Sequence, residues 1–296
     1  MFIRSTLAII AGLLCFVLTG AAGAVSGAVE LASVTWRNDD PRFGGFSGLH
    51  VFDGGEGFLT ISDRGAIVEA TFLRKNGVLS GVKLGPLNVL QGTQGRALTG
   101  HRTDAEGLAV RKNGRIYVSF EGAHRVWTYR NPSSEAAWLP RHPDFKGMQN
   151  NSSLEALAIG PDNTLYTIPE RSGRLDRPFP VYRYKGKTWS KPFSIPRRGP
   201  FLVVGADIGP DGRFYVLERH LGSIFGFETR VRRFNMTAKG LTQEVTLIQT
   251  RPGVHDNLEG LSVWEDASGK LRLTMISDDN FRGFQKTELV EYSLPE

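Results

Sequence analysis

The sequence contains a single cysteine, Cys15, and it lies within the first 24 residues. In this segment a basic residue, Arg4, precedes an apolar run over 7–18, and small residues follow that run. This order is typical of a cleaved secretory signal. A chain cleaved there would have no cysteine, and therefore no disulfide and no thiolate chemistry. We predict a signal peptide at residues 1–24, with a retained anchor as the alternative, and a periplasmic or secreted protein.

Long apolar runs and blocks of charge are absent beyond the predicted signal. No later stretch is long enough to span a bilayer, so we expect no stable membrane insertion after signal cleavage. The net charge of +6 falls to 35 − 30 = +5 once Arg4 is removed, and it is spread along the chain. This mild basicity argues against a nucleic-acid partner and suits a small anionic, phosphate-bearing substrate, although a cationic solubility charge is the simpler explanation. We also expect a monomer.

Several common catalytic motifs are missing. The sequence has no Gly-x-Ser-x-Gly, no His-Glu-x-x-His and no Gly-x-Gly-x-x-Gly, and its six histidines lack the spacing of metal ligands. These absences argue against a nucleophile elbow, a zinc protease site and a dinucleotide fold. His124 and His220 follow acids at predicted strand ends, so they are candidates for a proton-transfer role.

What the sequence does contain is a segment of two predicted strands that returns about every 50 residues. A tight turn containing Gly, Asn or Asp joins the two strands, because these residues tolerate the positive φ of hairpin turns. Each second strand ends on an acid. The positions Gly48, Gly107, Ala156, Gly205 and Gly260 are equivalent and are separated by 59, 49, 49 and 55 residues. Each interval has room for four strands, which predicts a β-propeller blade.

The predicted fold class is therefore all-β, a β-propeller that forms one domain over residues 25–296. Five copies are clear, and a weak one in region 80–100 or 185–200 would make six blades, so we predict six with five as the alternative. Residues 30–36 and 289–294 both look like strands, and their pairing in one blade would remove the free sheet edges. No sustained period of 3.6 residues is present, so helices should be few.

Acids recur at the start of the first strand and at the end of the second strand of the repeat. The inner strands of a propeller line its central channel, so these acids should converge at one channel mouth. Clustered carboxylates repel one another and need a cation or raised pKa values. Oxygen ligands without His or Cys favour calcium, with magnesium or manganese possible. The predicted metal ligands are Glu106, Glu155, Glu259, Asp278, Asp63 and Glu121, of which we expect three or four to contact the metal.

Arginine directly follows the strand-end acid in three copies of the repeat. Guanidinium groups bind phosphate oxygens in a bidentate manner, which suggests a phosphoester site beside the metal. The predicted catalytic residues are Arg64, Arg171, Arg219, Glu170 and Glu218. Salt bridges between each arginine and a neighbouring acid are an equally good explanation of the pattern.

Five motifs resemble a known family. They are Asp63-Arg64-Gly65, Asp104-Ala105-Glu106-Gly107-Leu108-Ala109, Leu154-Glu155-Ala156-Leu157-Ala158, Leu217-Glu218-Arg219 and Leu258-Glu259-Gly260-Leu261 with Ser277-Asp278-Asp279-Asn280-Phe281. In this order they resemble the phytase-like family, also described as "esterase-like activity of phytase", over residues 43–292. The resemblance implies an exported propeller whose acids carry phosphoesterase activity, by analogy with calcium-dependent phytases. The fourth copy departs from the pattern, with Asp207 in place of an aligned Glu.

The first hypothesis is an exported, metal-dependent phosphoric ester hydrolase. Calcium held by Glu106, Glu155, Glu259 and Asp278 would bind the phosphate and activate a water, while the arginines would offset developing charge. The second is a non-catalytic propeller with structural calcium that binds a ligand or a partner. The third is a calcium-dependent lactonase or esterase, which needs no arginine cluster.

Overall fold

The computed structural model describes residues 27–150, 152–223 and 226–295. The predicted signal at residues 1–24 lies outside these ranges. Within these ranges, twenty strands form five four-stranded sheets, each of which is antiparallel throughout. In chain order, the strands of the five blades are β2 (Phe46–Val51), β3 (Gly57–Ser62), β4 (Ala66–Lys75) and β5 (Val78–Val89); β6 (Ala105–Val110), β7 (Ile116–Phe120), β8 (Arg125–Tyr129) and β9 (Ala136–Trp138); β10 (Leu154–Ile159), β11 (Leu165–Pro169), β12 (Phe179–Lys185) and β13 (Thr188–Ile195); β14 (Leu202–Ile208), β15 (Phe214–Ser223), β16 (Gly226–Thr237) and β17 (Gly240–Gln249); β18 (Leu258–Glu265), β19 (Leu271–Ser277), β20 (Thr287–Ser293) and β1 (Val29–Trp36).

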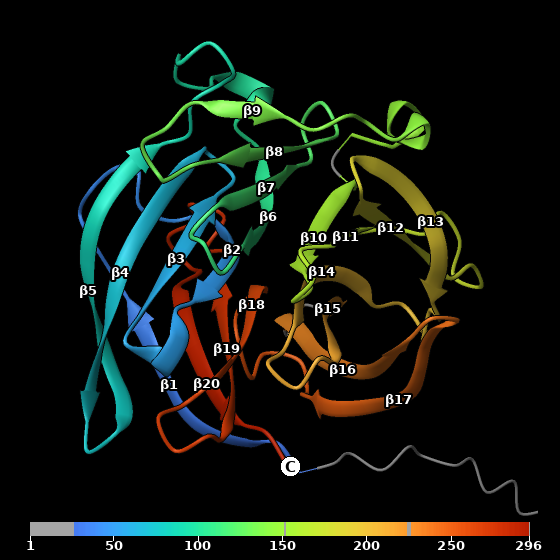
Figure 1. The fold of residues 1–296 in the computed structure, drawn as a ribbon. Coiled ribbons are helices and arrows are strands. Elements are labelled where there is room, and N and C mark those ends of the chain that lie inside the picture. The colour runs from blue at the N-terminus through green and yellow to red at the C-terminus, as the bar shows by residue number, and fades with distance from the viewer. Residues whose placement is uncertain (1–26, 151, 224–225, 296) are drawn as a thin grey trace, which may run out of the picture.

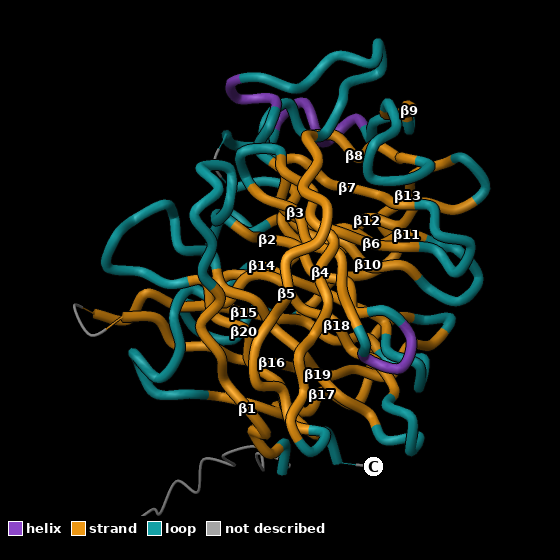
Figure 2. The backbone as a smooth tube through the Cα atoms, turned by 90° about the vertical axis from the view of Figure 1, so that its left-hand side faces the viewer, coloured by secondary structure: helices purple, strands orange, loops and turns teal. Residues whose placement is uncertain are grey.

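The five sheets are the blades of a propeller (Figure 1). The first strand of each blade, namely β2, β6, β10, β14 or β18, contacts the first strands of both neighbouring blades, which closes a ring around the axis. The fourth strand of each blade lies at the periphery. Helical structure in the described residues is limited to three short 3₁₀ turns, η1 (Asp53–Gly55), η2 (Gly100–Arg102) and η3 (Pro143–Gly147), which lie in loops (Figure 2). None of these helices is long or apolar enough to cross a membrane.

The two ends of the described chain meet in one blade, as predicted. Strand β1 is antiparallel to β20, with Trp36 opposite Thr287 and Val29 opposite Ser293. The sheet order is β1-β20-β19-β18, so the N-terminal strand completes the last blade from the outside. A closed ring leaves no blade to be added at either end, which limits the edge pairing that open sheets invite.

The blade number is five, the alternative given beside the favoured six. The two regions that looked like remnants of a sixth copy are fourth strands instead. Strand β5 pairs with β4 on the outside of the first blade, and β13 pairs with β12 on the outside of the third. The five sequence copies therefore correspond to five blades, one copy to each.

Glycine recurs in the first strands because the strands approach one another closely at the axis. A Cβ atom added at Gly107 would lie 2.6 Å from the carbonyl oxygen of Glu155, and one at Gly205 would lie 2.5 Å from that of Glu259. Neither contact is possible for a real side chain. Outside this ring, apolar side chains fill the spaces between blades, for example Phe46 and Phe58 beside Trp36. The repeat is thus dictated by packing around the axis, and that packing positions the site.

Candidate functional site

A bulge in each first strand directs one side chain toward the channel mouth. The pairing of first and second strands shifts register at the same place in all five blades. Such a bulge interrupts the alternation of side chains and re-aims the residue within it. The residues at these shifts are Ser47, Glu106, Glu155, Val204 and Glu259. Three of the five blades therefore present a glutamate to the axis.

Acids from the ends of the second strands join these glutamates around a cavity of about 290 Å³. We call it the carboxylate cavity. Its lining consists of Ser47, Asp63, Asp104, Glu106, Glu121, Glu155, Glu170, Arg219, Glu259, Asp278 and Asn280. Eight of these eleven residues are acids and one is an arginine. All six predicted metal ligands are among them, so the structure brings together the acids that the repeat pattern selected.

Three acids of the second blade lie close enough together that they could hold one metal ion. One carboxylate oxygen from each of Asp104, Glu106 and Glu121 lies within 4.8 Å of the other two. The prediction missed Asp104, although it stands two residues before Glu106 in the motif quoted above. It lies just before strand β6, outside the two recurring positions, so the repeat alone gave no reason to select it.

Burial sets the protonation of these acids. It raises the pKa of Asp63 to about 6, of Glu121 to about 7 and of Asp278 to about 8. For Glu106 and Glu155 the pKa is raised well above the usual range, first by burial and then by the neighbouring carboxylates. Without a cation, this cavity therefore retains protons near neutral pH.

Among the described residues, Arg219 is the one basic side chain that lines the carboxylate cavity. Its guanidinium donates to Glu259 and Asn257, and its other terminal nitrogen lies 3.2 Å from Glu170 Oε1. Burial opposes the charge, but Glu259, Glu170 and Glu155 raise the pKa of Arg219 above that of free arginine. Arg219 thus neutralises part of the cavity's charge, and among the described residues only Glu170 and Glu259 of the lining acids form ion pairs with a basic side chain.

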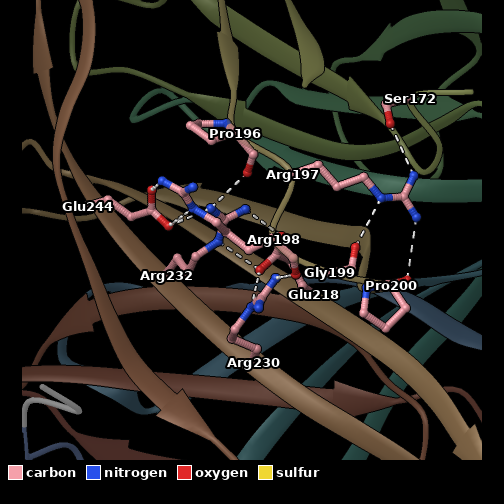
Figure 3. A network of polar contacts seen from close by, with 10 residues as sticks. All are labelled: Ser172, Pro196, Arg197, Arg198, Gly199, Pro200, Glu218, Arg230, Arg232 and Glu244. Atoms are coloured by element: carbon pink, nitrogen blue, oxygen red, sulfur yellow. Dashed lines mark hydrogen bonds and ion pairs between the residues drawn. The ribbon is translucent and has the colours of Figure 1, made fainter. Parts of the chain in front are cut away.

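Glu218 was predicted to be a catalytic residue, but its position in the structure is different. Its side chain is fully buried, and it accepts hydrogen bonds from Arg230 at 2.7 Å and from Arg232 at 2.8 Å (Figure 3). Arg232 also donates to Glu244 at 2.9 Å. Strand β15 continues to Ser223, so Glu218 lies within the strand and faces arginines of the adjacent β16. Within the described chain it lines no part of the carboxylate cavity.

The other predicted arginines also lie outside the carboxylate cavity. The guanidinium of Arg64 stacks on the ring of Phe281, 3.3 Å from its centroid. Arg171 is exposed and contacts Glu170 at 3.3 Å. The fourth-copy acid, Asp207, is half-buried elsewhere, where it accepts hydrogen bonds from the backbone N–H groups of Val263 and Ile208. In that blade Val204, and not Asp207, occupies the bulge position that is a glutamate in three other blades.

The two candidate proton-transfer histidines lie beside the carboxylate cavity. His124 Nδ1 is 2.8 Å from the hydroxyl of Ser153, whose backbone N–H donates to Glu121 Oε1 at 3.1 Å. His124 therefore supports the position of Glu121, and burial lowers its pKa. His220 lies 3.7 Å from Glu228 and lines a neighbouring cleft.

This neighbouring cleft has a volume of about 990 Å³, and Glu170, Arg219 and Asn280 line both it and the carboxylate cavity. We call it the adjoining cleft. Its charged side chains are predominantly basic: Arg171, Arg219, Arg282 and Lys286 against Glu170 and Asp256. Its lining also includes three apolar side chains that are largely exposed, Leu221, Val254 and Phe284. A cavity lined mainly by acids and a cleft whose charged side chains are mainly basic thus share one wall.

Comparisons with known proteins agree with this architecture. The family described as "Phytase-like: Esterase-like activity of phytase" matches residues 41–281. A comparison with curated proteins found no match. Among solved structures, an aldose sugar dehydrogenase from Streptomyces coelicolor is 13% identical, with a TM-score of 0.51 over 92% of this chain and 100% of the other. A gluconolactonase from Xanthomonas campestris is 15% identical, with a TM-score of 0.43 over 84% and 72%. At 13% identity, the likeness to the dehydrogenase structure shows the fold alone.

Proposed function

The chain belongs to the Phytase-like family, described as esterase-like activity of phytase, and from this premise we propose that it is an exported, metal-dependent hydrolase of phosphoric esters. One observation carries the proposal: a cavity lined by eight carboxylates shares a wall with a cleft rich in arginine and lysine. The first suits a divalent cation and the second suits an anionic substrate.

The donor set of the carboxylate cavity fits a hard cation. Every charged donor is a carboxylate oxygen, and neither His nor Cys lines the cavity in the described chain. Calcium accepts six to eight oxygen ligands, and magnesium and manganese also prefer oxygen. Asp104, Glu106 and Glu121 would hold the ion, with Glu155 and Glu259 next to them. When bound, such an ion supplies a Lewis acid for the phosphoryl group.

Residues of the chain itself would bind the substrate, stabilise developing charge and transfer protons. Arg171, Arg282 and Lys286 would bind the anionic groups of the substrate in the adjoining cleft, and Arg219 would stabilise the charge that develops at the shared wall. Asp278, which also lines the carboxylate cavity, would accept a proton from the attacking water and return it to the leaving group. The buried side chains among these acids, such as Glu106 and Glu155, lie in a low-dielectric environment that strengthens their electrostatic contacts.

Hydrolysis assays with three substrates test this function. The purified protein should hydrolyse bis(4-nitrophenyl) phosphate, 4-nitrophenyl phosphate or phytate with calcium, and lose that activity with chelator. The choice among the three reports whether diesters or monoesters are preferred. Inactivity of the folded protein toward all three, with calcium, magnesium and manganese each supplied, would overturn the proposal.

A calcium-dependent lactonase or carboxylic esterase is the second candidate, because two of the three predicted arginines do not enter the carboxylate cavity. The double variant Arg171→Gln/Arg282→Gln distinguishes the two functions. It should cripple a phosphoesterase and spare a lactonase, since a neutral lactone needs no cationic cleft. Calcium that raises the melting temperature without turnover of any ester would support the third reading, a binding propeller with structural calcium.

A further inference from the structure

A second basic pocket lies on the second blade, away from the site described above. It has a volume of about 370 Å³, within the range of roughly 300–1,000 Å³ that is common for small-molecule sites. It is formed by the chain over 92–102, by β8 and by the segment that follows β9. It shares no lining residue with the carboxylate cavity or the adjoining cleft. We call it the arginine pocket.

The charge of the arginine pocket is of one sign. Its lining contains four arginines, Arg96, Arg102, Arg125 and Arg141, and no acid. In the described part of the chain, none of the four forms an ion pair with a carboxylate. Elsewhere in the protein, arginines are commonly paired, as in the cluster around Glu218. A concave surface with four unpaired guanidinium groups attracts anions.

Arg125 makes the pocket more than a patch of surface charge. It is only 2% exposed, and its guanidinium lies 3.8 Å from the ring centroid of Phe120 and 4.2 Å from that of Trp127. Its terminal nitrogens donate to the carbonyl oxygens of Gly122 and Arg102, while its Nε has no partner. Among the described residues, the charge of Asp104 acts on Arg125, but no carboxylate forms an ion pair with it. A buried cation that is only partly compensated is costly, and a bound anion would reduce that cost.

Aromatic rings complete the lining. Trp138 is 62% exposed at the edge of the pocket, and its ring lies 5.8 Å from that of the buried Trp127 in an edge-to-face arrangement. The Nε1–H of Trp127 is buried without a partner. An exposed indole face beside guanidinium groups suits a flat ring that carries negative charge.

We propose that the arginine pocket is a binding site for a small organic anion that carries an aromatic ring. The anionic group would contact the guanidinium groups, and the ring would stack on Trp138. This site is separate from the carboxylate cavity and needs no metal. It would allow the protein to bind or sense an aromatic anion independently of ester hydrolysis.

The test uses naphthalene-2-sulfonate, which contains no ester and cannot be turned over. Titration calorimetry on the full protein should show saturable binding that is the same with calcium and with chelator. Arg102→Gln/Arg141→Gln should weaken binding by about tenfold or more, and Trp138→Ala by about fivefold. All three side chains are exposed, so these variants should fold.

Matched controls locate the binding. Arg130→Gln changes an exposed arginine directly after β8 that does not line the pocket, and Arg282→Gln changes one in the adjoining cleft. Both should bind the probe as the unmodified protein does, and so should Glu106→Gln. Absence of saturable binding would overturn the proposal, as would equal binding by Arg102→Gln/Arg141→Gln or a loss of binding only in Arg282→Gln. Equally tight binding of sulfate alone or of 2-naphthol alone would overturn the assignment of an aromatic anion.

Discussion

Two buried clusters of charged side chains in this propeller each contain the acid of a second strand. The charges that surround this acid are of opposite sign in the two clusters. Glu218 and Glu121 both occupy the acid position of a second strand. Glu218 receives hydrogen bonds from two arginines of the adjacent strand. Glu121 instead faces Asp104 and Glu155, and burial raises its pKa to about 7. Arginines of its own blade neutralise Glu218, whereas the charge of Glu121 remains available to a bound cation.

This difference shows that the repeat determines where an acid lies, whereas the charged side chains around the acid determine what it does. A buried carboxylate with arginine partners stabilises the fold only while both partners remain, because either charge alone is costly to bury. A buried carboxylate among other carboxylates lowers the stability of the metal-free protein and raises its affinity for a cation. The two clusters should therefore respond to mutation with opposite signs.

The largest expected effect comes from breaking the arginine-paired cluster. Arg232→Met should lower the free energy of unfolding by about 3–5 kcal/mol, because it leaves Glu218 and Glu244 with fewer partners in a buried site. Urea denaturation followed by circular dichroism measures the change. Arg130→Gln, at an exposed and unpaired arginine, is the matched control and should be neutral. A loss below 1 kcal/mol would show that the cluster is solvated.

The next effect concerns the carboxylate cavity. Glu106→Gln should reduce calcium affinity by about 100-fold, and it should make the metal-free protein more stable at pH 8, because the raised pKa of Glu106 in the folded protein favours the unfolded state at this pH and glutamine removes that contribution. Calorimetric titration with calcium and thermal melts in chelator measure the two quantities. Glu218→Gln should have the opposite effect on stability and no direct effect on calcium binding. The same sign for both variants would refute the comparison.

The pH dependence of stability should separate the metal-free and calcium-bound forms. Asp63, Glu121 and Asp278 have pKa values of about 6, 7 and 8 in the folded protein, against roughly 4 in an unfolded chain. The folded state therefore binds more protons than the unfolded state, so the free energy of unfolding should fall as the pH rises through this window. Melts in chelator from pH 5 to pH 9 should show this decline, and saturating calcium should flatten it. A metal-free protein that is more stable at pH 9 than at pH 5 would contradict the raised pKa values.

The smallest expected effects distinguish arginines that the sequence treats alike. Arg219→Gln should lower ester hydrolysis by about tenfold or more, because Arg219 alone of the predicted arginines lines the carboxylate cavity. Arg64→Gln removes a stacking contact with Phe281, of about 0.5–1 kcal/mol, and a positive charge near Asp63, and it should lower activity much less than Arg219→Gln does. Steady-state kinetics on both variants tests the contrast. Equal losses would place Arg64 in the site.

Much of the fold was predictable because its signals are local. The turns use Gly, Asn and Asp where positive φ is needed, as at Asn163 and Gly212, and the apolar residues of the strands follow them. The pairing of β1 with β20 was also predictable, since a propeller has to close. The blade number was not settled, because the fourth strands β5 and β13 carry no repeat motif and looked like remnants of another copy.

The sequence by itself determined the propeller, its family and the acids that meet at the channel mouth, because a repeat of fixed period brings equivalent positions to one axis. Only the tertiary structure decided what each acid does there. It added Asp104 to the carboxylate cavity and removed Glu218, Arg64 and Arg171 from it. The physical reason is that the environment of a side chain depends on bulges in its own strand and on charges from neighbouring strands. Those contacts are distant in the sequence, and its periodicity does not record them.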